Sequence, residues 1–223
     1  MNETLFNFYI FSWYFQIFTL LLIVCLIIYK NNFSFIFPNI LFSINLIITF
    51  ILELYGFYLY NNKLNNSQLG QFYCINNFSL LVPFYLIITF KNLKLKWVII
   101  IVFMLLFFSF ILYNIPFILH QEIIAAFMQN LILIFLGLLL ISQIFLKSIL
   151  KILVFQKIAL IVFFMILLGS IIDIALYYII KLPDLYFYSL QLLKNIFSYI
   201  GYIIIFYLLL IEKKYCVNYF RQI

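Results

Sequence analysis

Charge is scarce in this sequence. Only 9% of its 223 residues are charged, whereas 69% are hydrophobic. A soluble domain of this size would expose large apolar patches with such a composition. The scarcity of charge therefore excludes a soluble globular protein. It predicts an all-α integral membrane protein, a bundle of transmembrane helices that is embedded in the lipid bilayer.

Histidine, glycine and cysteine are scarce as well. The single histidine, His120, excludes a His-rich metal site, and the five glycines form no phosphate-binding, dinucleotide-binding or nucleophile-elbow motif. We expect no disulfide framework, because the three cysteines lie at different predicted depths: Cys25, Cys74 and Cys216. These absences predict a protein that is not an enzyme and has no metal or other cofactor.

Most of the sequence consists of long apolar runs. A helix of about 20 apolar residues crosses roughly 30 Å of hydrocarbon. The connections between the runs are too short for a soluble module, so we expect a single transmembrane domain over residues 1–223. Cutting the chain at its polar interruptions predicts a seven-transmembrane-helix bundle, with spans at about 8–29, 39–60, 68–90, 97–117, 123–146, 158–180 and 189–211.

Basic residues are distributed unevenly over the predicted connections. The side reached after the first, third, fifth and seventh spans carries ten: Lys30, Lys91, Lys94, Lys96, Lys147, Lys151, Lys157, Lys213, Lys214 and Arg221. The other side carries two, Lys63 and Lys181. Since Lys and Arg are retained on the cytoplasmic side, this predicts the N-terminus outside and the C-terminus inside. The net charge of +7 follows from this topology, and no nucleic acid is expected as a partner because the cations form no contiguous patch.

Polar side chains inside the predicted spans gather toward the outer side, and we call the following set the polar layer: Glu53, Asn76, Asn77, Gln129, Asn130, Asp173, Lys194 and Asn195. The inner half is expected to offer mainly Asn45, Ser109, Ser142 and Gln143. A charge at a helix centre costs about 2.5–3.5 kcal/mol on insertion scales, so the charged members should face the bundle interior. We expect Lys194 to pair with Asp173, and Glu53 either to join this pair or to be neutral.

Three roles remain open for the polar layer: a structural clamp between helices, a ligand pocket open to the outer side, or an ion or proton pathway. Two acids and one base would leave a negative charge, which a bound cation or a neutral acid would remove. A retinal site is not expected. Lys194 lies too far from the middle of its span, and the third span carries Asn76 and Asn77 where such a site has acids.

The two halves of the chain show a faint internal similarity. Glu53 precedes Asn76 by 23 residues, and Asp173 precedes Asn195 by 22, with Phe-Ser shortly after each asparagine. The first three and last three spans would then be parallel three-helix units joined by the fourth span. Some small transporters have this organisation, with a site at the interface of the repeats.

Two stretches resemble a known group of proteins. They are "ELYGFYLYNNKLNNSQLGQFYCINNFSLLVPFY" and "LQLLKNIFSYIGYIIIFY", and they are similar to uncharacterised seven-transmembrane-helix inner-membrane proteins of Bacteroidota. The last helix lacks the Trp expected at its inner end. The resemblance implies a bacterial inner-membrane location and no established activity. The composition also resembles that of proteins encoded by AT-rich protist mitochondria, which implies the mitochondrial inner membrane instead.

Three functions are compatible with these observations. The first is a non-enzymatic membrane protein that senses or binds a ligand, or a protein partner in the membrane, with its polar layer open to the outer side. The second is a structural subunit of a large membrane complex, for example a mitochondrial respiratory one. The third is a small-solute transporter with a 3+1+3 helix organisation.

Overall fold

The computed structural model describes residues 3–29, 37–64, 69–90, 95–114, 121–146, 154–178 and 184–211. Within these residues every regular element is a helix, which confirms the all-α class. Each helix overlaps one predicted span. The helices are α1 (Glu3–Tyr29), α2 (Phe37–Asn61), α3 (Leu69–Thr89), α4 (Leu95–Asn114), α5 (Gln121–Leu146), α6 (Val154–Tyr178) and α7 (Asp184–Ile211). His120, Cys216 and most of the lysines used to predict the topology lie outside the described residues.

Six of the described helices, all except α4, are long and apolar enough to cross a membrane. In α4 the described apolar segment, Lys96–Ile111, is shorter than a full span. Phe103, Phe107 and Phe110 follow one another at helical spacing on α4 and are each at least 64% exposed. An outer surface of this kind suits lipid. By the composition of its helices the chain is a polytopic membrane protein.

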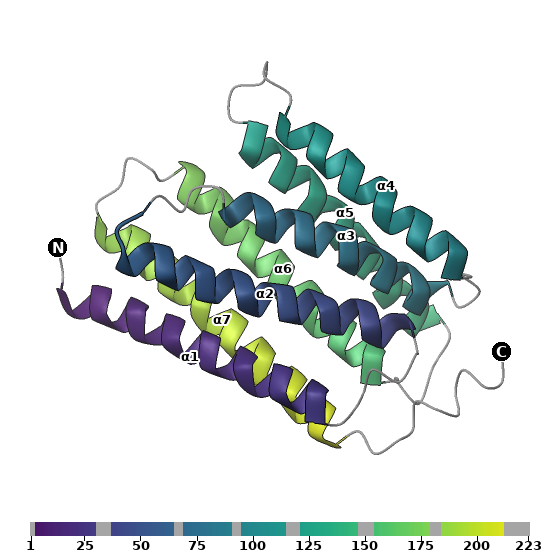
Figure 1. Cartoon of the computed structure of the whole chain (residues 1–223), viewed down its shortest axis with the longest axis horizontal. Helices are drawn as coiled ribbons and strands as arrows, with labels where there is room; N and C mark the ends of the chain where they lie inside the picture. Colours follow the sequence, from purple (N-terminus) through teal and green to yellow (C-terminus); the bar gives the residue numbers. More distant parts are fainter. Residues whose placement is uncertain are drawn as a thin grey trace.

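Six helices pack in the cyclic order α1, α2, α3, α5, α6, α7, and α7 returns to α1. Helix α4 lies outside this ring against α3 and α5 (Figure 1). If α1, α2 and α3 are exchanged with α5, α6 and α7 in that order, every pair of neighbouring helices in the ring becomes another pair of neighbouring helices. The packing thus has the contact order that two equivalent three-helix units would produce.

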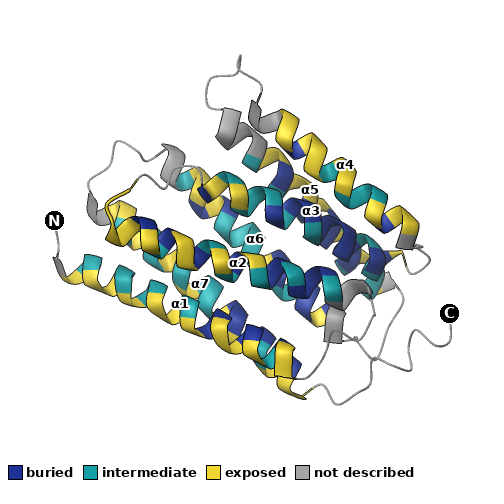
Figure 2. Ribbon diagram, viewed as in Figure 1, coloured by how far each residue is buried: buried dark blue, intermediate teal, exposed yellow. Residues whose placement is uncertain are grey.

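The two ends of the bundle are packed differently. We call the end where α1, α3 and α7 begin, and where α2 and α6 finish, the first end (Figure 1). From Tyr186 to Ile200 no side chain of α7 is buried, whereas Gly201, Tyr202, Ile205 and Leu209 are. On α1, burial begins only at Gln16. Figure 2 shows the same gradient along α1 and α3. At the first end α1 and α7 are therefore loosely covered, although Leu59 of α2 and Leu69 of α3 are buried there, and the other end is closed.

Large side chains close the opposite half. Phe42 of α2 stacks on Phe84 of α3 with ring centroids 5.3 Å apart. The next residue, Tyr85, is fully buried, and its hydroxyl donates a hydrogen bond of 2.6 Å to the backbone carbonyl of Ala159 on α6. This bond joins α3 to α6 across the ring.

Candidate functional site

Glu53 lies two turns before the end of α2 and has only 9% of its surface exposed. Trp13 donates an indole N–H to Oε2 at 2.6 Å, and Gln16 donates its amide Nε2 to Oε1 at 2.9 Å. The spacing of three residues places both donors on one face of α1. The hydroxyl of Tyr73, on α3, is a further hydrogen-bond partner. Glu53 thus holds α1, α2 and α3 together.

Lys194 of α7 forms the predicted pair with Asp173 of α6, with Nζ 2.5 Å from Oδ1. The lysine chain passes over Gly169, one turn before Asp173, where an added Cβ would lie 3.8 Å from Lys194 Cε. The side chains of Lys194 and Asp173 are 34% and 49% exposed. The expectation that both face the bundle interior is therefore met only in part, because the first half of α7 packs against α1 and α6 but has no fully buried side chain.

Glu53 does not form an ion pair with Lys194. Among the described residues the lysine pairs with Asp173, although its charge acts on Glu53 from a distance. The carboxylate of Glu53 is held instead by neutral donors. Of the two alternatives predicted for Glu53, membership of the pair is therefore wrong, since donors of α1 and α3 bind its carboxyl group, and the neutral form stays a prediction.

The asparagines of α3 bind to α2. Asn45 donates its amide to Asn77 Oδ1 at 3.1 Å. Asn76 donates to the Asn45 carbonyl and to Thr49 Oγ1, both at 3.2 Å. Sequence analysis assigned Asn45 to the inner half and separated it from this group. The separation is wrong, because Asn45 bonds both asparagines, although it lies in the first half of α2 as predicted.

The remaining members of the polar layer join other helices. Gln129 of α5, 1% exposed, donates to Ser109 of α4 at 2.9 Å. Ser109 lies five residues before α4 ends, so its assignment to the inner half is wrong too. Asn195 donates to Ser12 of α1 at 3.1 Å, and Asn130 is half-buried beside Gln129. The polar layer is thus a series of pairwise links, and Gln129 lies apart from the Glu53 group because α4 is outside the ring.

Sequence reasoning missed five partners of the polar layer: Ser12, Trp13, Gln16, Thr49 and Tyr73. The signal that could have found them is the position of Gln16, the one amide in the interior of the first apolar run, one turn after Trp13. Aromatic residues make up 22% of the chain, so Trp13 and Tyr73 did not stand out from those that serve as lipid anchors and packing groups.

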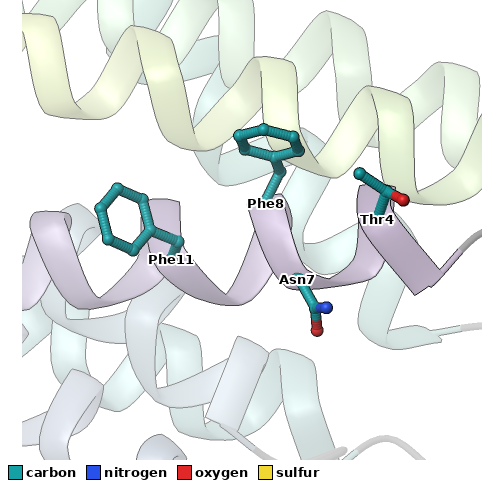
Figure 3. A pocket seen from close by; sticks show the side chains of 4 residues that line it. All are labelled: Thr4, Asn7, Phe8 and Phe11. Carbon is teal, nitrogen blue, oxygen red and sulfur yellow. The ribbon is translucent and has the colours of Figure 1, made fainter.

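A surface depression of about 540 Å³ lies elsewhere, on α1 near the first end (Figure 3). Thr4, Asn7, Phe8 and Phe11 line it, and all four belong to one helix. No member of the polar layer is among them. In the part of the chain that the structure describes, no three His, Cys, Asp or Glu side chains gather as they do in zinc and other transition-metal sites.

Comparison of the chain with protein-family models, with curated proteins and with solved structures finds no match. The chemistry must therefore be argued from the side chains. They form a buried group of hydrogen-bonded side chains around Glu53 and a partly exposed ion pair between α6 and α7.

Proposed function

We propose that this chain is a non-enzymatic integral membrane protein that binds a small ligand in its polar layer, entering from the first end. The observation that carries the proposal is the packing gradient. Glu53, Asp173, Lys194 and Asn195 lie in the half where α7 has no buried side chain, and the opposite half is closed by the apolar core. Polar groups that lie between the loosely covered first end and the closed half suit a binding site that a ligand reaches from one side.

The location of the protein is part of the same proposal. The excess of basic residues in the predicted connections after the first, third, fifth and seventh spans supports an orientation with the first end outside and the opposite end in the cytoplasm. The resemblance to Bacteroidota proteins supports the bacterial inner membrane, with the mitochondrial inner membrane as the alternative.

Cysteine labelling tests the proposed opening. In a background with Cys25, Cys74 and Cys216 changed to Ser, Ser12→Cys places a thiol beside Asn195, and Ser43→Cys places one in the closed half, where Ser43 is 5% exposed. A membrane-impermeant maleimide added outside intact cells should label Ser12→Cys, and Ser43→Cys should react only after denaturation.

Asn62→Cys is the positive control, because Asn62 is exposed at the first end. Protection of Ser12→Cys to the same degree as Ser43→Cys, while Asn62→Cys reacts, would show that the polar layer is sealed. The proposal would then fail.

Transport of a small solute is a second candidate, favoured by the exchangeable order of the helix contacts. In each unit, moreover, an acid late in the second helix bonds a side chain of the third helix: Glu53 with Tyr73, and Asp173 with Lys194. A transporter exposes its site to both sides in turn. Labelling of Ser43→Cys in inverted vesicles would favour transport over one-sided binding.

Binding of a protein partner is a third candidate, favoured by the half-exposed Asp173–Lys194 pair. Charged groups at this depth are costly against lipid, and a partner helix with a polar side chain could cover them. A pull-down in mild detergent checks this: a stoichiometric companion lost in the Asp173→Ala/Lys194→Ala double variant would identify the chain as a subunit of a membrane complex.

A further inference from the structure

Two buried amide oxygens in the neighbourhood of Glu53 have no hydrogen-bond partner among the described residues. Gln16, with 7% of its surface exposed, donates through Nε2 to the Glu53 carboxylate. Its other amide atom, Oε1, is buried and has no hydrogen-bond partner among the described residues. Since Oε1 and Nε2 are attached to one carbon, this oxygen lies beside the carboxylate. A second buried amide oxygen without a partner, Oδ1 of Asn76, lies one turn after Tyr73 on α3.

No cationic side chain contacts Glu53 among the described residues either. The described residues contain one ion pair, and in it the ammonium of Lys194 contacts Asp173. Trp13, Gln16 and Tyr73 are neutral donors that satisfy lone pairs but supply no positive charge. A buried carboxylate normally has a counter-charge within contact distance, because the cost of removing its hydration is large.

From these two observations we infer that Glu53 and Gln16 form a binding site for a monovalent metal cation of the Na⁺ or K⁺ class. The carboxylate supplies charge, and Gln16 Oε1 supplies the second oxygen ligand. Oxygen atoms are the ligands that hard cations prefer, and one positive charge compensates one carboxylate. The indole of Trp13, bonded to the same carboxylate at 2.6 Å, reports on occupancy.

The inference depends on the proposed function only for the route by which the cation arrives. In detergent micelles both ends of the bundle are open to solvent. A failure to bind cation there would therefore count against the cation site, and a sealed polar layer in the labelling experiment would count against the proposed function.

Fluorescence titration provides the test. The chain has two tryptophans, so Trp97→Phe, on the exposed side of α4, leaves Trp13 as the sole reporter. The purified protein is titrated with NaCl or KCl against N-methyl-D-glucamine chloride at constant ionic strength and pH. We expect a saturable change in Trp13 emission, its loss in Glu53→Gln, and a midpoint raised about tenfold or more in Gln16→Leu.

Gln143→Leu is the matched control, because Gln143 is a half-buried amide in the opposite half of α5. It should keep the wild-type midpoint. If Glu53→Gln does not fold, the comparison of Gln16→Leu with Gln143→Leu tests the cation site without it. An emission that does not respond to either salt, or that responds equally in Gln16→Leu and Gln143→Leu, overturns the inference. A response to pH but not to salt also overturns it and assigns Glu53 to a proton instead.

Discussion

Lys194 Nζ lies 2.5 Å from Asp173 Oδ1, and the pair joins α6 to α7 although neither side chain is buried. The lysine chain lies over Gly169, where an added Cβ would be in ordinary van der Waals contact with Lys194 Cε. The pair therefore neutralises two charges within the membrane-spanning region and fixes the packing of the last two helices at the same time.

Breaking this pair should cost more than removing it. Asp173→Ala or Lys194→Ala leaves one unpaired charge in a span and should lower the free energy of unfolding by about 2 kcal/mol, whereas the double variant leaves none and should recover most of the loss. Thermal unfolding in detergent measures the difference. Lys157→Ala, an exposed lysine elsewhere on α6, is the control and should be close to wild type. Additive losses in the double variant would show that the pair contributes no coupling.

The glycines of the bundle should differ in their tolerance of alanine. A Cβ on Gly137 of α5 would overlap the ring of Phe163, which is 2% exposed, and a Cβ on Gly201 of α7 would overlap Met165. Gly137→Ala should lower the unfolding free energy by about 1–3 kcal/mol, and Gly201→Ala by less because methionine is flexible.

Gly70 supplies the contrast, since nothing lies within 4 Å of an added Cβ there. Gly70→Ala should leave stability unchanged or raise it by up to about 1 kcal/mol through helix propensity. Melting curves of the three variants in one detergent give the ranking. Equal effects at Gly70 and Gly137 would contradict the packing of α5 against α6.

Removing the Tyr85 hydroxyl should loosen the closed half. Tyr85→Phe deletes the 2.6 Å bond to the Ala159 carbonyl and should lower the unfolding free energy by about 1 kcal/mol. It should also increase the reactivity of Ser43→Cys toward maleimide, because α3 and α6 lose their polar link. Tyr207→Phe, an exposed tyrosine on α7, is the control. Unchanged reactivity in the Tyr85 variant would show that apolar packing alone closes this half.

The proposed orientation is tested by reporter fusions. Alkaline phosphatase fused after Leu64 should be active, because this connection lies at the first end and is expected outside, and a fusion after Phe90 should be inactive. Green fluorescent protein at the C-terminus should fluoresce. Activity after Phe90 but not after Leu64 would invert the orientation and with it the side from which the ligand enters.

The helices could be predicted because apolar runs separated by polar connections leave few alternatives in a membrane. The Asp173–Lys194 pair could be predicted because consecutive spans place the two residues at the same depth. The partners of Glu53 could not, since Trp13 and Gln16 carry no charge to draw attention to them. The bonds of Asn45 and Ser109 to the polar layer could not be predicted either, because neutral side chains on different helices give no sign in the sequence that they pair.

The ring itself was also beyond prediction. Transmembrane helices are apolar on nearly all sides, so no hydrophobic stripe shows which face meets another helix. The contact of α1 with α7, helices from opposite ends of the chain, rests on side-chain fit. The Ser12–Asn195 hydrogen bond and the edge-to-face rings of Phe15 and Tyr199, 5.7 Å apart, are examples of it.

The central claim is that the two three-helix units form a ring around the polar layer. Cross-linking of α1 to α7, where the ring closes, tests this claim most directly. In the cysteine-free background, Ser12→Cys/Asn195→Cys should form an intramolecular disulfide on mild oxidation, detected by mass spectrometry of the digested protein. Ser12→Cys/Phe103→Cys should not, because α4 lies at the opposite edge of the bundle (Figure 1). A disulfide in the second variant and none in the first would contradict the account.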